Sequence, residues 1–181
     1  IAGGAGNDTL AGGAGNDILS FGATELTAAD TLAGGDGTDS ISYSATETMV
    51  DADLTLATSI ETITAAATAG ITATLGEIAT AAGVNAVTTS VVVTNNVINL
   101  DYDFDNDITV TLTGADGDSV VANAAFDNKL TVAIKDSLLV SDGTFGAADD
   151  DDKLTAGTNT EDTLLITGSG TAISSADMTD V

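Results

Sequence analysis

The sequence contains no cysteine, proline, histidine, tryptophan or arginine. Without cysteine the fold uses neither disulfides nor thiolate metal sites, which fits an exported protein whose export route makes no use of disulfide chemistry. Without histidine or cysteine, a serine or threonine nucleophile has no base beyond a carboxylate or a lysine. Carboxylate pairs of the glycosidase type arise by chance among 28 acidic residues. We therefore expect no enzyme activity in this chain.

Positive charge is also scarce, because Lys129, Lys135 and Lys153 oppose 28 acidic residues and the net charge is −25. Such a charge opposes compaction by self-repulsion, which bound divalent cations would relieve. A nucleic acid partner is not expected, since phosphate binding relies on lysine and arginine. No apolar run is long enough to cross a membrane, so membrane insertion is not expected.

Aromatic residues are limited to two tyrosines and four phenylalanines, too few for a thick core. Threonine, serine, valine and isoleucine abound, which favours strands. A narrow solenoid, whose core is one or two side chains wide, accommodates both facts.

A nine-residue unit opens the chain in two adjacent copies, at 3–11 and 12–20, and returns at 34–42. All three copies fit G-G-x-G-x-D-x-U-x, where U is a large apolar residue. The glycines reach positive φ and allow backbone carbonyls to approach closely. The aspartate adds a carboxylate, and calcium takes six to eight such oxygens. The last three residues extend as a strand whose central residue (Leu10, Leu19 or Ile41) points into the core.

These nonapeptides resemble those of the RTX family of calcium-binding bacterial exoproteins. The resemblance implies a parallel β-roll in which successive turns fall on opposite sides, so that repeats n and n+2 share an ion. Residues 21–33 then form a unit with an expanded turn, in which Asp30 takes the place of Asp8. One ion is implied between Asp8 and Asp30 and another between Asp17 and Asp39. The alternative is that these segments are ordinary Gly/Asn/Asp turns without ions.

A longer repeat of about 123 residues underlies the nonapeptides. Phe21-Gly22-Ala23 recurs as Phe145-Gly146-Ala147, while Asp152 and Asp162 take the positions of Asp30 and Asp39. Tandem modules of this kind indicate a long array. Including this second copy, the residues predicted to bind calcium are Gly4, Gly6, Asp8, Gly13, Gly15, Asp17, Asp30, Gly35, Gly37, Asp39, Asp152 and Asp162.

Residues 45–97 are rich in alanine and threonine, and their short apolar runs at 60–63, 71–75 and 84–87 suit the rungs of a second solenoid. Between the last two runs a short helix is predicted. Thr74-Leu75-Gly76-Glu77 has the pattern of a capping box, and Gly83 suits the residue that ends the helix.

Residues 98–142 show a different pattern, in which Ile108, Val110 and Leu112 alternate with threonines and Leu130, Val132 and Ile134 alternate in the same way. Turn-forming residues between them predict antiparallel strands with one buried face. Before them, aspartates occupy every second position from 101 to 107, which on a strand would share one face. That face is either a calcium site or a solvated acidic surface.

The fold class expected is mainly all-β: a parallel β-roll or β-solenoid with calcium-binding turns, plus an antiparallel β segment. The predicted segments are the RTX β-roll (1–44), a solenoid-like segment (45–97), the antiparallel segment (98–142) and the start of the next module copy (143–181). The acidic composition, rich in alanine and threonine, and short motifs such as Ser59-Ile60-Glu61-Thr62-Ile63 resemble those of giant RTX-type surface-layer proteins and repeat adhesins.

This resemblance implies type I secretion and a location on the bacterial cell surface, where the chain folds in extracellular calcium. Ca²⁺ is the expected cofactor, and copies of the chain itself are the expected partners. A cell-surface glycan or other surface component is a further candidate partner. The expected role is a calcium-stabilised structural segment that assembles into a surface layer or filament. The alternatives are the stalk of an adhesin and, less in keeping with the long repeat, the secretion-assisting tail of an exoenzyme.

Overall fold

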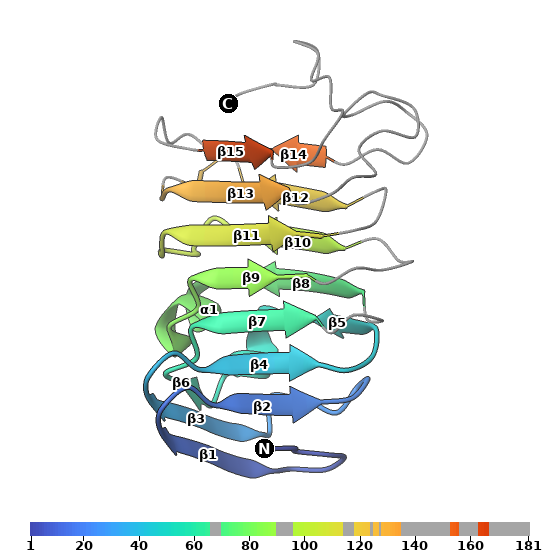
Figure 1. Ribbon diagram of the computed structural model, residues 1–181, viewed down its shortest axis with the longest axis vertical. Coiled ribbons are helices and arrows are strands. Elements are labelled where there is room, and N and C mark those ends of the chain that lie inside the picture. The colour runs from blue at the N-terminus through green and yellow to red at the C-terminus, as the bar shows by residue number, and fades with distance from the viewer. Residues whose placement is uncertain are drawn as a thin grey trace.

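The computed structural model is a β-solenoid that rises from the N-terminal strands to the C-terminal ones (Figure 1). It describes residues 1–65, 70–89, 96–113, 118–123, 125–126, 128–134, 153–155 and 163–166. Every strand pairing within these ranges is parallel. The predicted parallel solenoid is therefore confirmed.

One seven-stranded sheet runs along the height of the solenoid, with its strands stacked in chain order. Its strands are β2 (Ile18–Phe21), β4 (Ser40–Tyr43), β7 (Thr62–Ala65), β9 (Ala86–Thr88), β11 (Ile108–Leu112), β13 (Leu130–Ile134) and β15 (Thr163–Ile166). This sheet continues from β4 to β7 and from β9 to β11, across two of the predicted segment boundaries. The boundaries themselves stay predictions.

Two smaller sheets lie behind the first in the view of Figure 1. The three-stranded sheet holds β1 (Thr9–Ala14), β3 (Thr31–Asp36) and β6 (Ala57–Thr58). The five-stranded sheet holds β5 (Glu47–Met49), β8 (Ile71–Leu75), β10 (Val97–Leu100), β12 (Ser119–Ala122) and β14 (Lys153–Thr155). Successive strands of the chain thus alternate between the front sheet and the sheets behind it, except that β5 and β6 follow each other in the two different back sheets.

The core is a narrow column between the sheets, filled by the inward residues of each strand. The apolar residues of the nonapeptide units are buried, with Leu19 and Ile41 at 0% exposed and Leu10 at 8%. Their predicted inward orientation is confirmed. Each such side chain contributes about 1.5–3 kcal/mol by leaving water, and stacking makes that burial available to every rung.

The prediction of antiparallel strands in residues 98–142 is wrong. Ile108, Val110 and Leu112 are buried as their alternation predicts. However, β11 pairs with β13 in parallel, with Ile108 opposite Leu130. Between them in sequence lies β12, which belongs to the five-stranded sheet. Alternation identifies the buried face of a strand but does not say which strand pairs with it.

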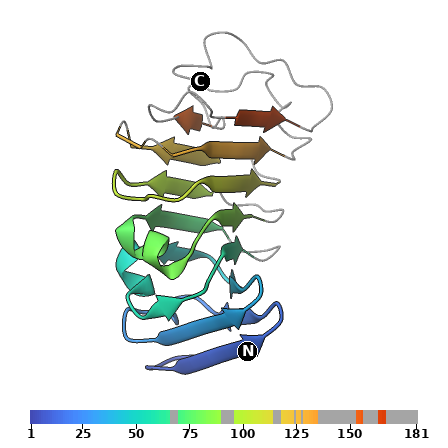
Figure 2. The same cartoon turned by 90° about the vertical axis from the view of Figure 1, so that its left-hand side faces the viewer.

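The helix α1 (Glu77–Ala82) forms where it was predicted, and Gly83 ends it with φ of 107°. Its beginning differs, because Thr74 and Leu75 lie in β8 and form no capping box. Instead Asp51, in the 3-10 helix η1 (Asp51–Leu54), accepts hydrogen bonds from the N–H groups of Gly76, Ile78 and Ala79 at 2.8, 3.1 and 2.8 Å. Helix α1 packs beside η1 on one flank of the solenoid (Figure 2).

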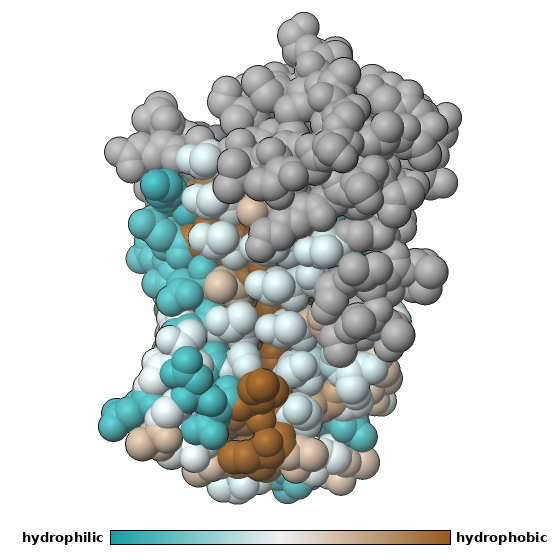
Figure 3. Space-filling view, viewed as in Figure 1, coloured by the Kyte–Doolittle hydropathy of each residue, from teal (hydrophilic) through white to brown (hydrophobic). Residues whose placement is uncertain are grey.

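The outward face of the front sheet is mostly neutral in hydropathy, and hydrophilic residues gather at the edge where its strands begin (Figure 3). The turns that precede β2, β4 and β7 lie at this edge and carry Asp17, Asp39 and Glu61. In the described part of the chain, no helix has the length and apolarity needed to span a membrane.

Candidate calcium sites

The glycines of the nonapeptide turns adopt backbone conformations that other residues rarely reach. The six glycines predicted as calcium ligands all have positive φ: 91° for Gly4, 118° for Gly6, 110° for Gly13, 107° for Gly15, 112° for Gly35 and 144° for Gly37. The turns also stack closely, since a Cβ atom on Gly35 would lie 1.9 Å from the carbonyl oxygen of Gly13. Glycine is therefore required at Gly35 for two reasons: its backbone has a positive φ, and the neighbouring rung leaves no room for a Cβ atom.

The aspartates of stacked turns are joined by hydrogen bonds. The N–H of Asp8 donates to Asp30 Oδ1 and the N–H of Asp17 donates to Asp39 Oδ1, each at 2.7 Å. In each bond the two residues are 22 positions apart in sequence. The structure thus brings together the two aspartate pairs that the resemblance implied. In each pair one carboxylate oxygen of the later aspartate is used to align the rungs.

The second oxygens of Asp8, Asp17 and Asp39 are buried and accept no hydrogen bond from the described residues. A buried carboxylate oxygen without a donor is strongly unfavourable unless a cation or ordered water supplies the partner. A Cβ atom on Gly12 would lie 2.7 Å from Asp17 Oδ2 and 2.4 Å from the carbonyl oxygen of Gly34. Two oxygens from neighbouring rungs therefore converge beside Gly12, which is the donor chemistry that calcium prefers.

The pair formed by Asp8 and Asp30 offers fewer free carboxylate oxygens to an ion. Asp30 is 0% exposed, but its Oδ2 accepts from the N–H and the hydroxyl of Thr27 at 2.7 and 3.1 Å. The expanded turn thus satisfies its own carboxylate, and only Asp8 Oδ2 is left for an ion. The geometry favours the pair Asp17 and Asp39 as the better calcium site.

The ligands would come largely from the backbone. Among the described residues, no group of three or more acidic side chains is close enough to hold a metal by itself. The glycine-rich turns supply the missing oxygens as carbonyl groups, as the sequence predicts. Asp152 and Asp162, the predicted ligands of the second module copy, lie outside the described residues.

The aspartates at 101–107 lie in the turn between β10 and β11, and not on a strand, where they would have shared one face. Asp105 Oδ1 accepts from Asn128 Nδ2, and Asp107 Oδ1 accepts from the N–H of Lys129, both at 3.0 Å. These two carboxylates are exposed and join successive rungs. Phe104 is buried and stacks on Phe126, with 6.4 Å between ring centroids.

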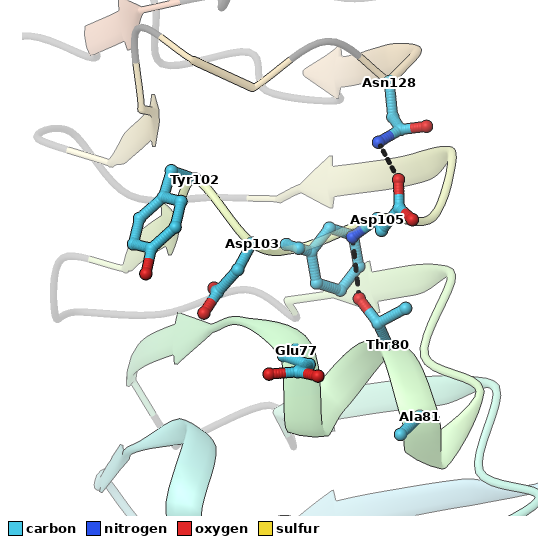
Figure 4. Close-up of a pocket in the computed structure, with 8 residues that line it drawn as sticks. Glu77, Thr80, Ala81, Tyr102, Asp103, Asp105 and Asn128 are labelled. Carbon is cyan, nitrogen blue, oxygen red and sulfur yellow. Dashed lines mark hydrogen bonds between the residues drawn. The ribbon is translucent and has the colours of Figure 1, made fainter.

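A hollow of about 590 Å³ lies beside this turn, lined in part by Glu77, Thr80 and Tyr102 (Figure 4). Residues that line it hold the turn against α1: the N–H of Asp105 donates a hydrogen bond of 2.8 Å to the hydroxyl of Thr80. For Asp105 and Asp107 these contacts favour a solvated acidic surface. Asp103 differs, because its Oδ1 is buried and accepts no hydrogen bond from the described residues, so both interpretations of the aspartates stay predictions.

Tyr43, the last residue of β4, is a buried titratable group of the repeat segment. Tyr43 is 0% exposed, and within the described residues its hydroxyl group has no hydrogen-bond partner. Burial, followed by the negative charges of Glu47 and Asp53, raises the pKa of Tyr43 above its ordinary value of 10.0. Burial and the charge of Glu47 also raise the pKa of Asp53, against a hydrogen bond from Val50 that lowers it.

Sequence reasoning missed two residues that the structure adds to this edge, Ser59 and Glu61. The N–H of Asp39 donates to Glu61 Oε2 at 2.7 Å, again across 22 residues. A signal was present, because Glu61-Thr62-Ile63 repeats the order of acid, hydroxyl and isoleucine found in Asp39-Ser40-Ile41.

Comparison with known proteins agrees with this geometry. Residues 1–23 and 27–45 match the family model of the RTX calcium-binding nonapeptide repeat, in four copies. The search of curated proteins and the search of solved structures gave no significant match.

Proposed function

Since residues 1–23 and 27–45 are RTX calcium-binding nonapeptide repeats, we propose that this chain is a calcium-stabilised structural segment of an extracellular bacterial surface protein. Such repeats bind Ca²⁺, and proteins that carry them are generally secreted by bacteria. The observation that carries the proposal is the stack of aspartates whose second oxygens are buried without a hydrogen-bond donor in the described chain. The ion is then a part of the fold, and no catalytic role is proposed.

The role of the ion follows from the charges at the turns. Asp17 and Asp39 lie in adjacent rungs, and their ionised carboxylates repel each other unless a cation lies between them. Extracellular calcium modules bind with dissociation constants of about 10⁻⁴–10⁻³ M. At the low calcium of a cytosol, the net charge of −25 favours an expanded chain. Outside the cell, calcium neutralises the turns and the solenoid forms.

We propose further that copies of the segment assemble into a surface layer or filament. The solenoid supports this role, because stacked rungs form an elongated body from short-range contacts and suit repetition in tandem. The alternative, the stalk of an adhesin, is favoured by one feature: β1 and β15 lie at opposite ends of the long axis. A stalk needs this arrangement to carry a further domain away from the surface.

The test is a calcium titration of the chelated protein, followed by far-UV circular dichroism and light scattering together. We expect strand signal to appear near millimolar calcium, with large particles forming over the same range. An equal concentration of magnesium is the control, because magnesium gives up its water reluctantly. Strand formation without large particles would favour the stalk. Circular dichroism that does not change between excess chelator and millimolar calcium would refute the calcium-dependent fold.

A further inference from the structure

The turn at residues 58–61 is stacked on the third nonapeptide turn, although the family match ends at residue 45. In the back sheet Ala33 is opposite Thr58, which places Ser59 opposite Gly34. In the front sheet Ser40 is opposite Thr62, which places Glu61 opposite Asp39. A shorter turn without the repeat sequence therefore occupies the position of the next calcium-binding turn.

The oxygens around Gly34 reproduce those around Gly12 in the rung below. A Cβ atom on Gly34 would lie 1.9 Å from the carbonyl oxygen of Ser59 and 2.5 Å from Asp39 Oδ2. For Gly12 the corresponding atoms are the Gly34 carbonyl oxygen and Asp17 Oδ2, at 2.4 and 2.7 Å. The carbonyl of Ser59 thus takes the place that the carbonyl of Gly34 holds one rung earlier.

The carboxylate of Asp39 is the second, independent sign of a ligand at this position. Asp39 is 0% exposed, and no described residue donates a hydrogen bond to its Oδ2. Its other oxygen is used by the N–H of Asp17. Burial without a donor is unfavourable for an ionised group, whereas a divalent cation between Asp39 and the Ser59 carbonyl would satisfy it.

Two further features of the turn fit a cation. Ser59 has a φ of 54°, which residues other than glycine seldom adopt and which occurs in this turn where its carbonyl oxygen approaches Gly34. Glu61 brings a second carboxylate beside Asp39, and its longer side chain spans the gap left by the shorter turn. Because Asp39 is shared with the site at Asp17, Glu61 supplies the additional negative charge that a second divalent ion requires.

The pattern ends at Glu61. The register of β7 and β9 places Asn85 opposite Glu61, and the N–H of Asn85 donates to the Glu61 carbonyl at 3.0 Å, just as the N–H of Glu61 donates to the Asp39 carbonyl at 3.1 Å. A neutral amide thus follows the last acidic residue of the column.

We propose that Asp39 Oδ2, the Ser59 carbonyl and the Glu61 carboxylate form a calcium site outside the nonapeptide repeats, which ends the column of ions. The proposal rests on the proposed calcium-dependent fold. The site joins the repeat segment to the solenoid above it, since its ligands come from the turns that lead into β4 and β7.

The test is the number of Ca²⁺ ions bound per chain, measured by equilibrium dialysis against calcium for the whole chain and two variants. Glu61→Gln keeps an oxygen that can accept from the N–H of Asp39 but loses the charge. We expect it to bind one ion fewer than the unchanged chain while keeping its circular dichroism in saturating calcium. Glu77→Gln, an equal change of charge at an exposed residue of α1, is the matched control and should keep the full number.

A second variant tests the role of the Ser59 backbone. Because the ligand is a carbonyl group and φ is positive, Ser59→Gly should keep the full number of ions.

An unchanged ion count in Glu61→Gln, with calcium still bound, would overturn the proposal and leave the calcium-dependent fold standing. If the unchanged chain binds no calcium, the calcium-dependent fold fails first. A Glu61→Gln variant that fails to fold in calcium while Glu77→Gln folds would also count against the proposal, since the substitution retains the hydrogen bond.

Discussion

Gly13 and Gly35 offer a way to separate the strain of a turn from the closeness of stacking. Their φ angles are 110° and 112°, so an alanine at either position is strained to the same extent. Their surroundings differ, because a Cβ atom on Gly13 would have no atom within 4 Å, whereas one on Gly35 would lie 1.9 Å from Gly13 O.

The expected effects follow from this difference. Gly13→Ala should lower the free energy of unfolding by about 1–3 kcal/mol, the range for a residue in a rarely populated conformation. Gly35→Ala carries the same strain plus an overlap with the rung below, which adds about 1–3 kcal/mol. Against a domain stability of about 5–15 kcal/mol, the second variant should lose a large share of its stability.

The assay is urea unfolding in saturating calcium, followed by circular dichroism, with the unchanged chain as reference. The reasoning predicts that the midpoint for Gly35→Ala lies below that for Gly13→Ala. If the two variants unfold with free energies within about 0.5 kcal/mol of each other, the close stacking of the turns has no energetic role.

The remaining predictions concern single side chains. Asp17→Asn should bind one Ca²⁺ ion fewer in equilibrium dialysis, and an unchanged count would remove the carboxylate from the site. Asp51→Ala leaves the N–H groups at the start of α1 without their acceptor, so urea unfolding should show a loss of about 1–3 kcal/mol. The raised pKa of Tyr43 stabilises the fold below pH 10.0, and this contribution is lost as pH rises, because only the unfolded state then ionises. Tyr43→Phe should abolish this alkaline loss in urea midpoints, while Tyr102→Phe, at a side chain 65% exposed, should keep it.

The nonapeptide turns could be predicted in detail because their requirements are local. A positive φ is a property of one residue, so the glycine spacing identified Gly4, Gly6, Gly13, Gly15, Gly35 and Gly37 before any contact was known. The period of two along a strand likewise identified the buried residues, including Ile108 and Val110. The end of α1 at Gly83 is a third local feature of this kind.

Contacts between rungs were decided only by the tertiary structure. Whether β11 pairs with β12 or with β13 depends on which sheet each strand joins, and alternation is the same in both cases. The acceptor for the start of α1 is Asp51, which lies 25 residues before Gly76 in sequence and belongs to another element. Glu61 joins the column of Asp17 and Asp39 because the strand register places it there.

By itself, then, the sequence determined the type of turn, the inward face of each strand and the calcium chemistry, because glycine conformation, side-chain alternation and carboxylate oxygens are properties of short segments. The tertiary structure alone decided which strands pair, how the rungs are capped and where the column of acidic residues ends. These depend on groups 22 or more residues apart, which only the stacking of rungs brings within hydrogen-bonding distance.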